Sequence, residues 1–351
     1  FGSSACRPRP RGDPASVPPP GRLLSPPLPL PLLPRPLPPA LDAMAKCDGV
    51  VCCFGCMSLI PGFTEHVVDK LAFFPPKPPG YYIDGDGKLF VLGEGELDGE
   101  GLLEALPDFS TEGIQVAPVT MHTSRGSTIY GVHFRRLDAT KTVLFSHGNS
   151  ADCGSSFVPC LELCRELRVN VLVYDYTGYG LSSGTPSEKD MYADIDAARD
   201  YLTQDCGEPL DSIVCYGQSL GSVPSIDLAS RCCLGGVILH SALASGLRVI
   251  HEDLQTTPWF DIFKNVVKIA DVQCPVFVIH GNQDLEVPIE HGRALHEACP
   301  PRFAAEPWWV QEAGHHDIET HWRSMYLRKL QLFLRSLAPV EQEDSEGQPF
   351  T

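Results

Sequence analysis

From about residue 119 onward, short apolar runs rich in β-branched residues alternate with stretches whose apolar residues recur at helical spacing. Alternation of this kind is typical of a largely parallel sheet whose faces are covered by helices. We predict strands over residues 128–134, 142–147, 170–175, 212–216, 236–240, 275–280 and 306–311. The pattern therefore predicts an α/β fold with a mostly parallel central sheet flanked by helices.

Two helices are indicated by their ends and by their apolar faces. The run Ser187-Glu188-Lys189-Asp190 resembles a capping box, and apolar residues follow it at helical spacing. A second apolar face, near the end of the chain, predicts the last helix and consists of Trp322, Tyr326, Leu330, Phe333 and Leu337.

Composition divides the rest of the chain into four parts around the folded domain that we expect at 119–337. Residues 1–43 hold 14 of the 33 prolines and no hydrophobic period, so we expect them not to fold. Met44 opens a different composition, and we interpret it as the natural start. We expect a Cys-rich segment at 44–74, a Pro-rich and acidic linker or insertion at 75–118, and a fraying acidic tail at 338–351.

The chain is acidic and rich in cysteine, with a formal net charge of −17 and 14 cysteines. The charge argues against nucleic acid as a partner, because phosphates attract clustered Lys and Arg. The chain is long and carries most of its cysteines in strand-like or helix-like segments, so we expect a reducing compartment rather than a disulfide framework. Prolines interrupt the Leu-rich stretch 23–41, and no transmembrane helix is predicted.

A candidate nucleophile follows the strand predicted at 212–216. Gly217-Gln218-Ser219-Leu220-Gly221 lies directly between that strand and the helical pattern from Val223 to Arg231. A G-x-S-x-G at a sharp strand-to-helix turn holds its serine in a strained conformation at a helix N-terminus, where negative charge is favoured. We therefore predict Ser219 to be a nucleophile, with glycine required on both sides because a Cβ would crowd the turn.

A serine hydroxyl needs a base to take its proton and an acid to orient that base. Asp284 follows the strand predicted at 275–280, and His315 follows the strand predicted at 306–311, which gives the expected chain order. Glu286 is an alternative acid, further along its loop. His316 is an alternative base, but two adjacent side chains do not share one direction, and we favour His315.

An oxyanion hole needs two backbone donors, one just after the nucleophile and one in the loop after an early strand. We predict the amides of Leu220 and Asn149, the latter in the loop after the strand at 142–147. These features together predict a serine hydrolase of the α/β-hydrolase fold. About 35 residues separate the strands at 236–240 and 275–280, so we expect a small lid.

Two segments contain residues of the kinds that bind metal ions or carry acyl chains. Four cysteines, Cys47, Cys52, Cys53 and Cys56, lie among apolar residues. Zinc at Cys53 and Cys56 is disfavoured because no second ligand pair follows. A small apolar patch that packs on the enzyme is a further alternative. We favour S-acylation, in which two acyl chains anchor stably. Asp84-Gly85-Asp86-Gly87 hints at calcium but lacks the later ligands, so we favour a solvated loop. We predict no metal and no cofactor.

The chain resembles the alpha/beta-hydrolase-domain-containing 17 proteins, a family of membrane-attached protein depalmitoylases. The resemblance runs from about 119 to 337 and is preceded by a matching segment at Lys70–Pro76. Its most specific runs are Phe145–Asn149, Asp175–Gly184, Pro186–Lys189, Tyr192–Ala198, Tyr216–Ser219, Asp227–Arg231 and Gly314–Glu319. The chain departs from the family in the spacing of its N-terminal cysteines and at His316, where Asn is expected.

The resemblance implies a palmitoyl-protein thioesterase that acts on S-acylated membrane proteins. It also implies peripheral attachment through acylated cysteines at the cytoplasmic face of plasma or endosomal membranes. Two other functions stay open from the residues alone. The same triad cleaves oxygen esters, as in a lipase or monoacylglycerol-type esterase. A non-catalytic scaffold that recruits partners through the proline-rich and acidic segments is disfavoured, because a scaffold needs no complete triad.

Overall fold

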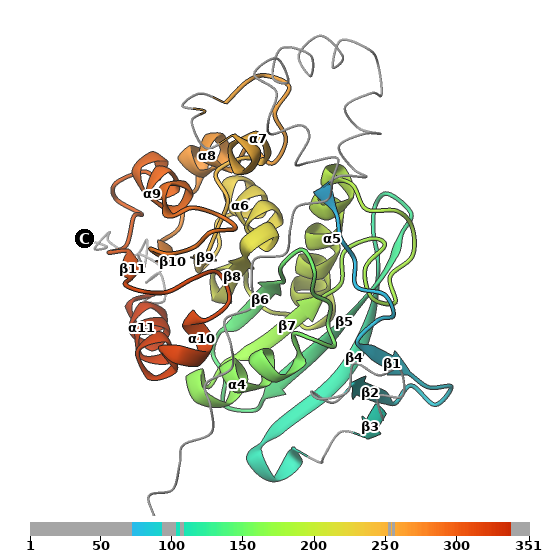
Figure 1. The fold of residues 1–351 in the computed structure, drawn as a ribbon. Helices are drawn as coiled ribbons and strands as arrows, with labels where there is room; N and C mark the ends of the chain where they lie inside the picture. Colours follow the sequence, from blue (N-terminus) through green and yellow to red (C-terminus); the bar gives the residue numbers. More distant parts are fainter. Residues whose placement is uncertain (1–71, 93–102, 106–108, 252–253, 255–256, 338–351) are drawn as a thin grey trace, which may run out of the picture. The chain divides into compact units, whose positions relative to one another are not determined.

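The computed structural model describes residues 72–92, 103–105, 109–251, 254 and 257–337 (Figure 1). The predictions for residues 1–43, for the four clustered cysteines and for the tail at 338–351 lie outside these residues. S-acylation of the cysteine cluster therefore stays a prediction.

An eight-stranded sheet forms the centre of the described chain, in the order β11-β10-β9-β8-β6-β7-β5-β4. The strands β6 to β11 pair in parallel, whereas β5 runs antiparallel to both β4 and β7. The strands are β4 (Ile114–His122), β5 (Thr128–Arg136), β6 (Thr142–Ser146), β7 (Asn170–Tyr174), β8 (Ile213–Gln218), β9 (Gly236–His240), β10 (Val276–Gly281) and β11 (Trp308–Val310). All seven predicted strands are present, and the mostly parallel sheet is confirmed.

The sheet is buried on both faces because successive side chains of a strand point to opposite sides. In β6, Val143 and Phe145 pack on one face and Leu144 on the other. The first face is covered by α4 (Phe157–Leu167) and α11 (Arg323–Ser336), and the second by α5 (Glu188–Asp200), α6 (Ser222–Arg231) and α9 (Ile289–Ala298) (Figure 1). This burial explains why the strands are continuous apolar runs rather than alternating ones.

Both predicted helices are present. The Ser187 hydroxyl caps α5 and accepts a hydrogen bond from the Asp190 amide at 3.1 Å. In α11, Tyr326, Leu330 and Phe333 are buried, as their spacing predicts. Short helices α7 (Gly246–Ile250) and α8 (Asn265–Lys268) lie between β9 and β10, and α10 (Ile318–His321) directly precedes α11.

The segment 75–118 is more structured than the sequence analysis expected. It contains β1 (Tyr81–Ile83), β2 (Leu89–Leu92) and β3 (Leu103–Ala105), which form an antiparallel sheet, and the main sheet already begins at Ile114. Tyr81 and Leu89 are buried, so short apolar runs can form strands even where prolines and acids dominate the composition. Asp84 accepts the amides of Asp86 and Lys88 at 3.0 and 2.8 Å, which makes it a turn residue.

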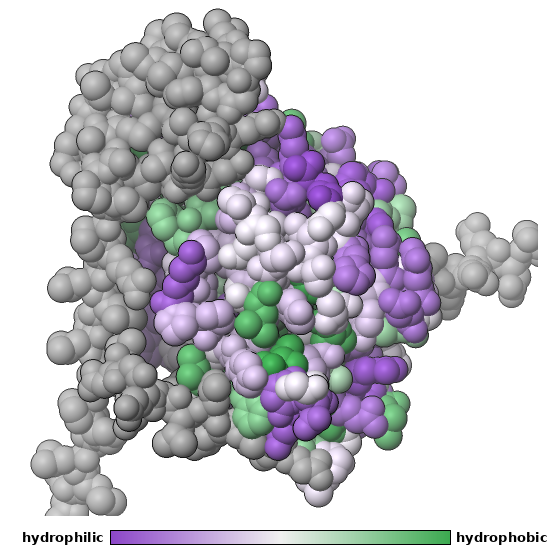
Figure 2. Space-filling view, turned by 90° about the vertical axis from the view of Figure 1, so that its right-hand side faces the viewer, coloured by the Kyte–Doolittle hydropathy of each residue, from purple (hydrophilic) through white to green (hydrophobic). Residues whose placement is uncertain are grey.

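On the face drawn in Figure 2, hydrophilic and neutral residues predominate, and the apolar ones form small separate groups between them. Among the described helices, none has the length and apolar character that a membrane crossing requires.

Candidate active site

A tight turn between β8 and α6 presents Ser219. Its φ of 50° lies in the left-handed region that non-glycine residues rarely adopt, so the predicted strain is present. A Cβ on Gly221 would lie 1.9 Å from the Ser146 carbonyl oxygen, and one on Gly217 would lie 2.6 Å from the Gly221 carbonyl oxygen. Close backbone approach therefore requires both glycines.

The loops after β10 and β11 bring Asp284 and His315 to the same serine. The His315 Nε2 atom lies 3.0 Å from the Ser219 Oγ atom, and its Nδ1 atom lies 2.7 Å from Asp284 Oδ2. Asp284 and His315 are 31 residues apart and His315 and Ser219 are 96 apart, yet the parallel strands end at one edge of the sheet. The structure thus brings the three predicted residues into one hydrogen-bonded line.

The Asp284 carboxylate is buried and held from several directions. Its Oδ1 atom accepts the amides of Glu286 and Val287 at 3.0 and 2.8 Å. Burial would raise the pKa of Asp284, but hydrogen bonds with His280 and His315 outweigh it and hold this pKa below its usual range. An ionised Asp284 accepts the Nδ1 proton of His315, which leaves the Nε2 lone pair directed at the Ser219 hydroxyl.

The two alternative residues, Glu286 and His316, bind each other. The His316 Nε2 atom lies 3.1 Å from Glu286 Oε1, and the two side chains are 63% and 48% exposed. The hydrogen bond to Glu286 raises the pKa of His316 and lowers that of the glutamate. They pair with each other at the surface, and neither side chain is a partner in the hydrogen bonds that join His315 to Asp284 and Ser219.

One described cluster has metal-ligand character, because potential ligand atoms of Glu286, His315 and His316 all lie within 4.8 Å of one another. Both ring nitrogens of His315 are already engaged, one with Asp284 and one with Ser219. A metal ion at this cluster would therefore have to displace one member of the line.

The predicted oxyanion donors belong to two segments next to the nucleophile. Leu220 follows Ser219 in the turn, and the loop after β6 approaches from the neighbouring strand, where a Cβ on Gly148 would lie 3.9 Å from the Ser219 Cβ atom. The Asn149 side chain is engaged elsewhere, since its Oδ1 atom accepts the Phe74 amide at 2.9 Å. The roles of the Leu220 and Asn149 amides as donors stay predictions.

Sequence reasoning missed several polar side chains around this site. The His280 Nε2 atom donates to the Val287 carbonyl at 2.7 Å and lies 3.3 Å from Asp284. Gln218 binds Glu319 across the site, 101 residues away. Local spacing carries no signal for such pairs, because each partner is placed by a different element.

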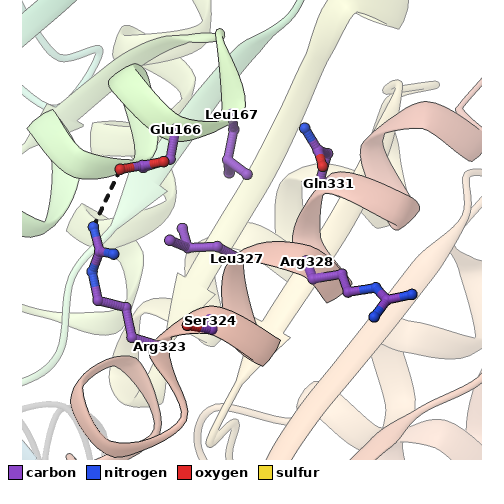
Figure 3. A pocket seen from close by; sticks show the side chains of 7 residues that line it. All are labelled: Glu166, Leu167, Arg323, Ser324, Leu327, Arg328 and Gln331. Carbon is purple, nitrogen blue, oxygen red and sulfur yellow. Dashed lines mark hydrogen bonds and ion pairs between the residues drawn. The ribbon is translucent and has the colours of Figure 1, made fainter.

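A cavity of about 330 Å³ lies between α4 and α11, and none of the three aligned residues lines it (Figure 3). An ion pair of 3.3 Å between Arg323 and Glu166 joins the two helices at one side. Its other lining residues are Leu167, Ser324, Leu327, Arg328 and Gln331. This cavity shows no paired nucleophile and base, so the candidate active site remains the turn at Ser219.

Solved structures place the fold. An esterase from Pyrococcus furiosus, Pf2001, superposes with a TM-score of 0.56 and 18% identity, over 66% of this chain and 97% of that one. The alpha/beta hydrolase GrgF from Penicillium superposes with a TM-score of 0.51 and 15% identity, over 63% of this chain and 98% of that one. The chain therefore has the α/β-hydrolase fold that its sequence predicts.

Sequence relatives place the family. A family model described as Chlamydia CHLPS protein (DUF818) matches residues 131–232. The alpha/beta hydrolase domain-containing protein aho-3 of Caenorhabditis elegans is 41% identical over 286 residues, 81% of each chain. Alpha/beta hydrolase domain-containing protein 17B of Xenopus laevis is 40% identical over 289 residues, 81% of this chain and 95% of its own. This chain is a hydrolase and belongs to the alpha/beta hydrolase domain-containing protein 17 family.

Proposed function

We propose that this protein is a serine hydrolase that removes fatty-acyl groups, palmitoyl above all, from S-acylated proteins at membranes. The observation that carries the proposal is the alignment of His315 between Ser219 at 3.0 Å and Asp284 at 2.7 Å. A serine is activated when a histidine lies within hydrogen-bond reach of its hydroxyl and a buried carboxylate orients that histidine.

The proposed reaction has two halves. Ser219 Oγ attacks the thioester carbonyl while His315 Nε2 takes its proton, and collapse of the oxyanion intermediate breaks the C–S bond. The proton on His315 passes to the departing cysteine thiolate, which leaves an acyl-serine. Water then attacks the ester with His315 as base, which releases the fatty acid and restores the Ser219 hydroxyl.

The thioester substrate is supported by the family and by the sequence that precedes the described residues. Cys47, Cys52, Cys53 and Cys56 are candidate acylation sites, and two acyl chains would hold the enzyme at the bilayer. Tethering enzyme and substrate to one surface raises their effective concentration. The insert between β9 and β10 is small, and its described part holds the short helices α7 and α8 and a 3₁₀ turn at Ile269–Asp271. This small insert suits an acyl chain presented on a bulky protein.

A carboxylesterase is the second candidate, because the same arrangement of serine, histidine and aspartate hydrolyses both oxygen esters and thioesters. The site geometry alone does not separate the two substrates, so the test has to compare them directly.

The first experiment is labelling of the full chain with a fluorophosphonate probe. The wild type should label, Ser219→Ala should not, and Ser230→Ala should label as the wild type because its hydroxyl only binds the Asp227 carbonyl at the end of α6. Labelling that survives Ser219→Ala would overturn the serine assignment.

The second experiment compares release of palmitate from an S-palmitoylated peptide with release from a monoacylglycerol, both presented in the same vesicles. The proposal expects a higher kcat/KM for the thioester. A clear preference for the glyceride would assign the chain to the carboxylesterases instead.

A further inference from the structure

The segment Ala72–Tyr81, which we call the strap, lies on the loop Gly148–Gly154 that follows β6. The Asn149 carboxamide forms hydrogen bonds with the backbone of the strap at two residues. Its Oδ1 atom accepts the Phe74 amide at 2.9 Å, and its Nδ2 atom donates to the Ala72 carbonyl at 2.8 Å. This pairing uses the donor and the acceptor of one side chain on the backbones of two residues.

Aromatic packing fixes the same end of the strap. The Tyr179 hydroxyl donates to Asn149 Oδ1 at 2.6 Å. Phe73 is only 6% exposed, and its ring meets the edges of Tyr179 and Phe263 at centroid distances of 6.5 and 5.8 Å. The strap is therefore packed into the protein and not merely laid along its surface.

The other end of the strap is fastened to the far side of the same loop. The Gly80 amide donates to Asp152 Oδ2 at 2.6 Å, and a Cβ on Gly154 would lie 2.3 Å from the Gly80 carbonyl oxygen. The Tyr81 hydroxyl donates to Asp175, whose second oxygen accepts the Cys153 amide at 2.8 Å. The loop is thus clamped at both ends by residues that precede the main sheet.

We propose that the strap is part of the catalytic machinery, because it sets the conformation of the loop that carries the Asn149 amide. The Asn149 side chain is a positioning group for its own backbone donor. Oxyanion donors act through a fixed position within a few tenths of an ångström, and a short loop holds that position only if its side chains are restrained. This inference rests on the proposed serine-hydrolase function.

The strap also connects the proposed membrane anchor to the oxyanion loop along the chain. It follows Cys56, the last cysteine of the proposed acylated anchor, along the chain, and it ends on the loop that carries the Asn149 amide. The functional unit therefore includes residues well upstream of the domain start expected at residue 119.

The test uses three variants of the full chain and a short-chain p-nitrophenyl ester. Asn149→Asp keeps the size and the acceptor but removes the donor to the Ala72 carbonyl, and Phe73→Ala removes the packed ring. Tyr82→Ala is the matched control, since this side chain follows the strap and is 49% exposed. We expect kcat to fall about 10- to 100-fold in the first two variants, with KM changed less than about 3-fold.

A trifluoromethyl ketone, which forms an oxyanion on Ser219, separates positioning from general stability. Its Ki should rise in step with KM/kcat across the variants, whereas a purely structural role would leave the Ki of the folded fraction unchanged. Circular dichroism at the assay temperature measures that fraction. If Asn149→Asp unfolds, the test uses Tyr179→Phe instead, which removes one hydroxyl and keeps the ring. Its kcat and its Ki for the trifluoromethyl ketone are then compared with those of the wild type.

The outcomes separate this inference from the proposed function. A folded Asn149→Asp or Tyr179→Phe variant with wild-type kcat and Ki overturns the role of the strap while the function stands. A wild-type chain without Ser219-dependent hydrolysis overturns both.

Discussion

Gln218 and Glu319 form a hydrogen bond of 2.6 Å between Nε2 and Oε1 that spans the two halves of the candidate active site. Gln218 directly precedes Ser219 at the end of β8, and Glu319 lies in α10, just after the loop that carries His315. Glu319 Oε1 also lies 3.6 Å from Nδ1 of the buried His240. The same Nδ1 atom is hydrogen-bonded to the Tyr216 hydroxyl at 2.8 Å. The bond therefore holds the nucleophile turn and the histidine loop together.

Gln218→Met should loosen this attachment without changing the size of the side chain. We expect kcat to fall about 10-fold, because small misplacement of a base is costly, while the melting temperature changes little. Steady-state ester hydrolysis measures the effect, with Gln331→Met on α11 as the matched control. A Gln218→Met enzyme with the same kcat as the control would show that the bond is dispensable.

The two adjacent histidines should differ sharply in their effect on hydrolysis. His315→Ala should lower kcat by a factor on the order of 10⁴, because the serine loses its base. His316→Ala should stay within about 3-fold, since its partner is the exposed Glu286. Steady-state hydrolysis of one ester by both variants measures this difference. Comparable losses of kcat in the two variants would reverse the assignment of the base.

Asp194 should make the protein less stable as pH rises. It is fully buried and accepts the Thr177 amide and hydroxyl at 2.7 and 2.8 Å, and burial raises its pKa to about 7. A raised folded-state pKa contributes stability that is complete below the unfolded-state pKa of about 3.9 and is lost as pH rises through the folded-state pKa. Between pH 5 and pH 8 the loss should be about 3 kcal/mol.

Urea unfolding at these two pH values measures that loss. In Asp194→Asn, which cannot ionise, the decline should be smaller than in the wild type by the same amount. Asp271→Asn, at an exposed carboxylate, should decline as the wild type does. Parallel declines in all three proteins would contradict the role of Asp194.

The N-terminal cysteines should control membrane attachment if they are acylated. Replacing Cys47, Cys52, Cys53 and Cys56 by Ser should move most of the protein from the membrane to the supernatant on fractionation, because no acyl chain remains to insert. Cys233→Ser is the matched control, since this thiol is exposed on the described domain. An unchanged distribution of the four-fold variant would end the anchor proposal.

The main sheet and the turn at Ser219 were predictable from the amino-acid sequence. Continuous apolar runs predicted seven of the eight strands of the main sheet, and the eighth, β4, was missed because Pro118 and alternating polar residues interrupt its apolar pattern. The strained turn was predictable because its two glycines and the helix after it are local features. Parallel strands that end at one edge also made the meeting of Ser219, Asp284 and His315 predictable.

Tertiary structure alone decided which side chains support that line. The pairing of Asn149 with residues 72–74, the bond from Gln218 to Glu319 and the burial of His315 beside an exposed His316 depend on packing between elements up to 101 residues apart. The spacing of apolar residues indicates which face of a helix or strand is buried, but it does not indicate which other element packs against that face. A polar side chain finds its partner only when the backbones of both elements are fixed, and for that reason these contacts carry no signature along the chain.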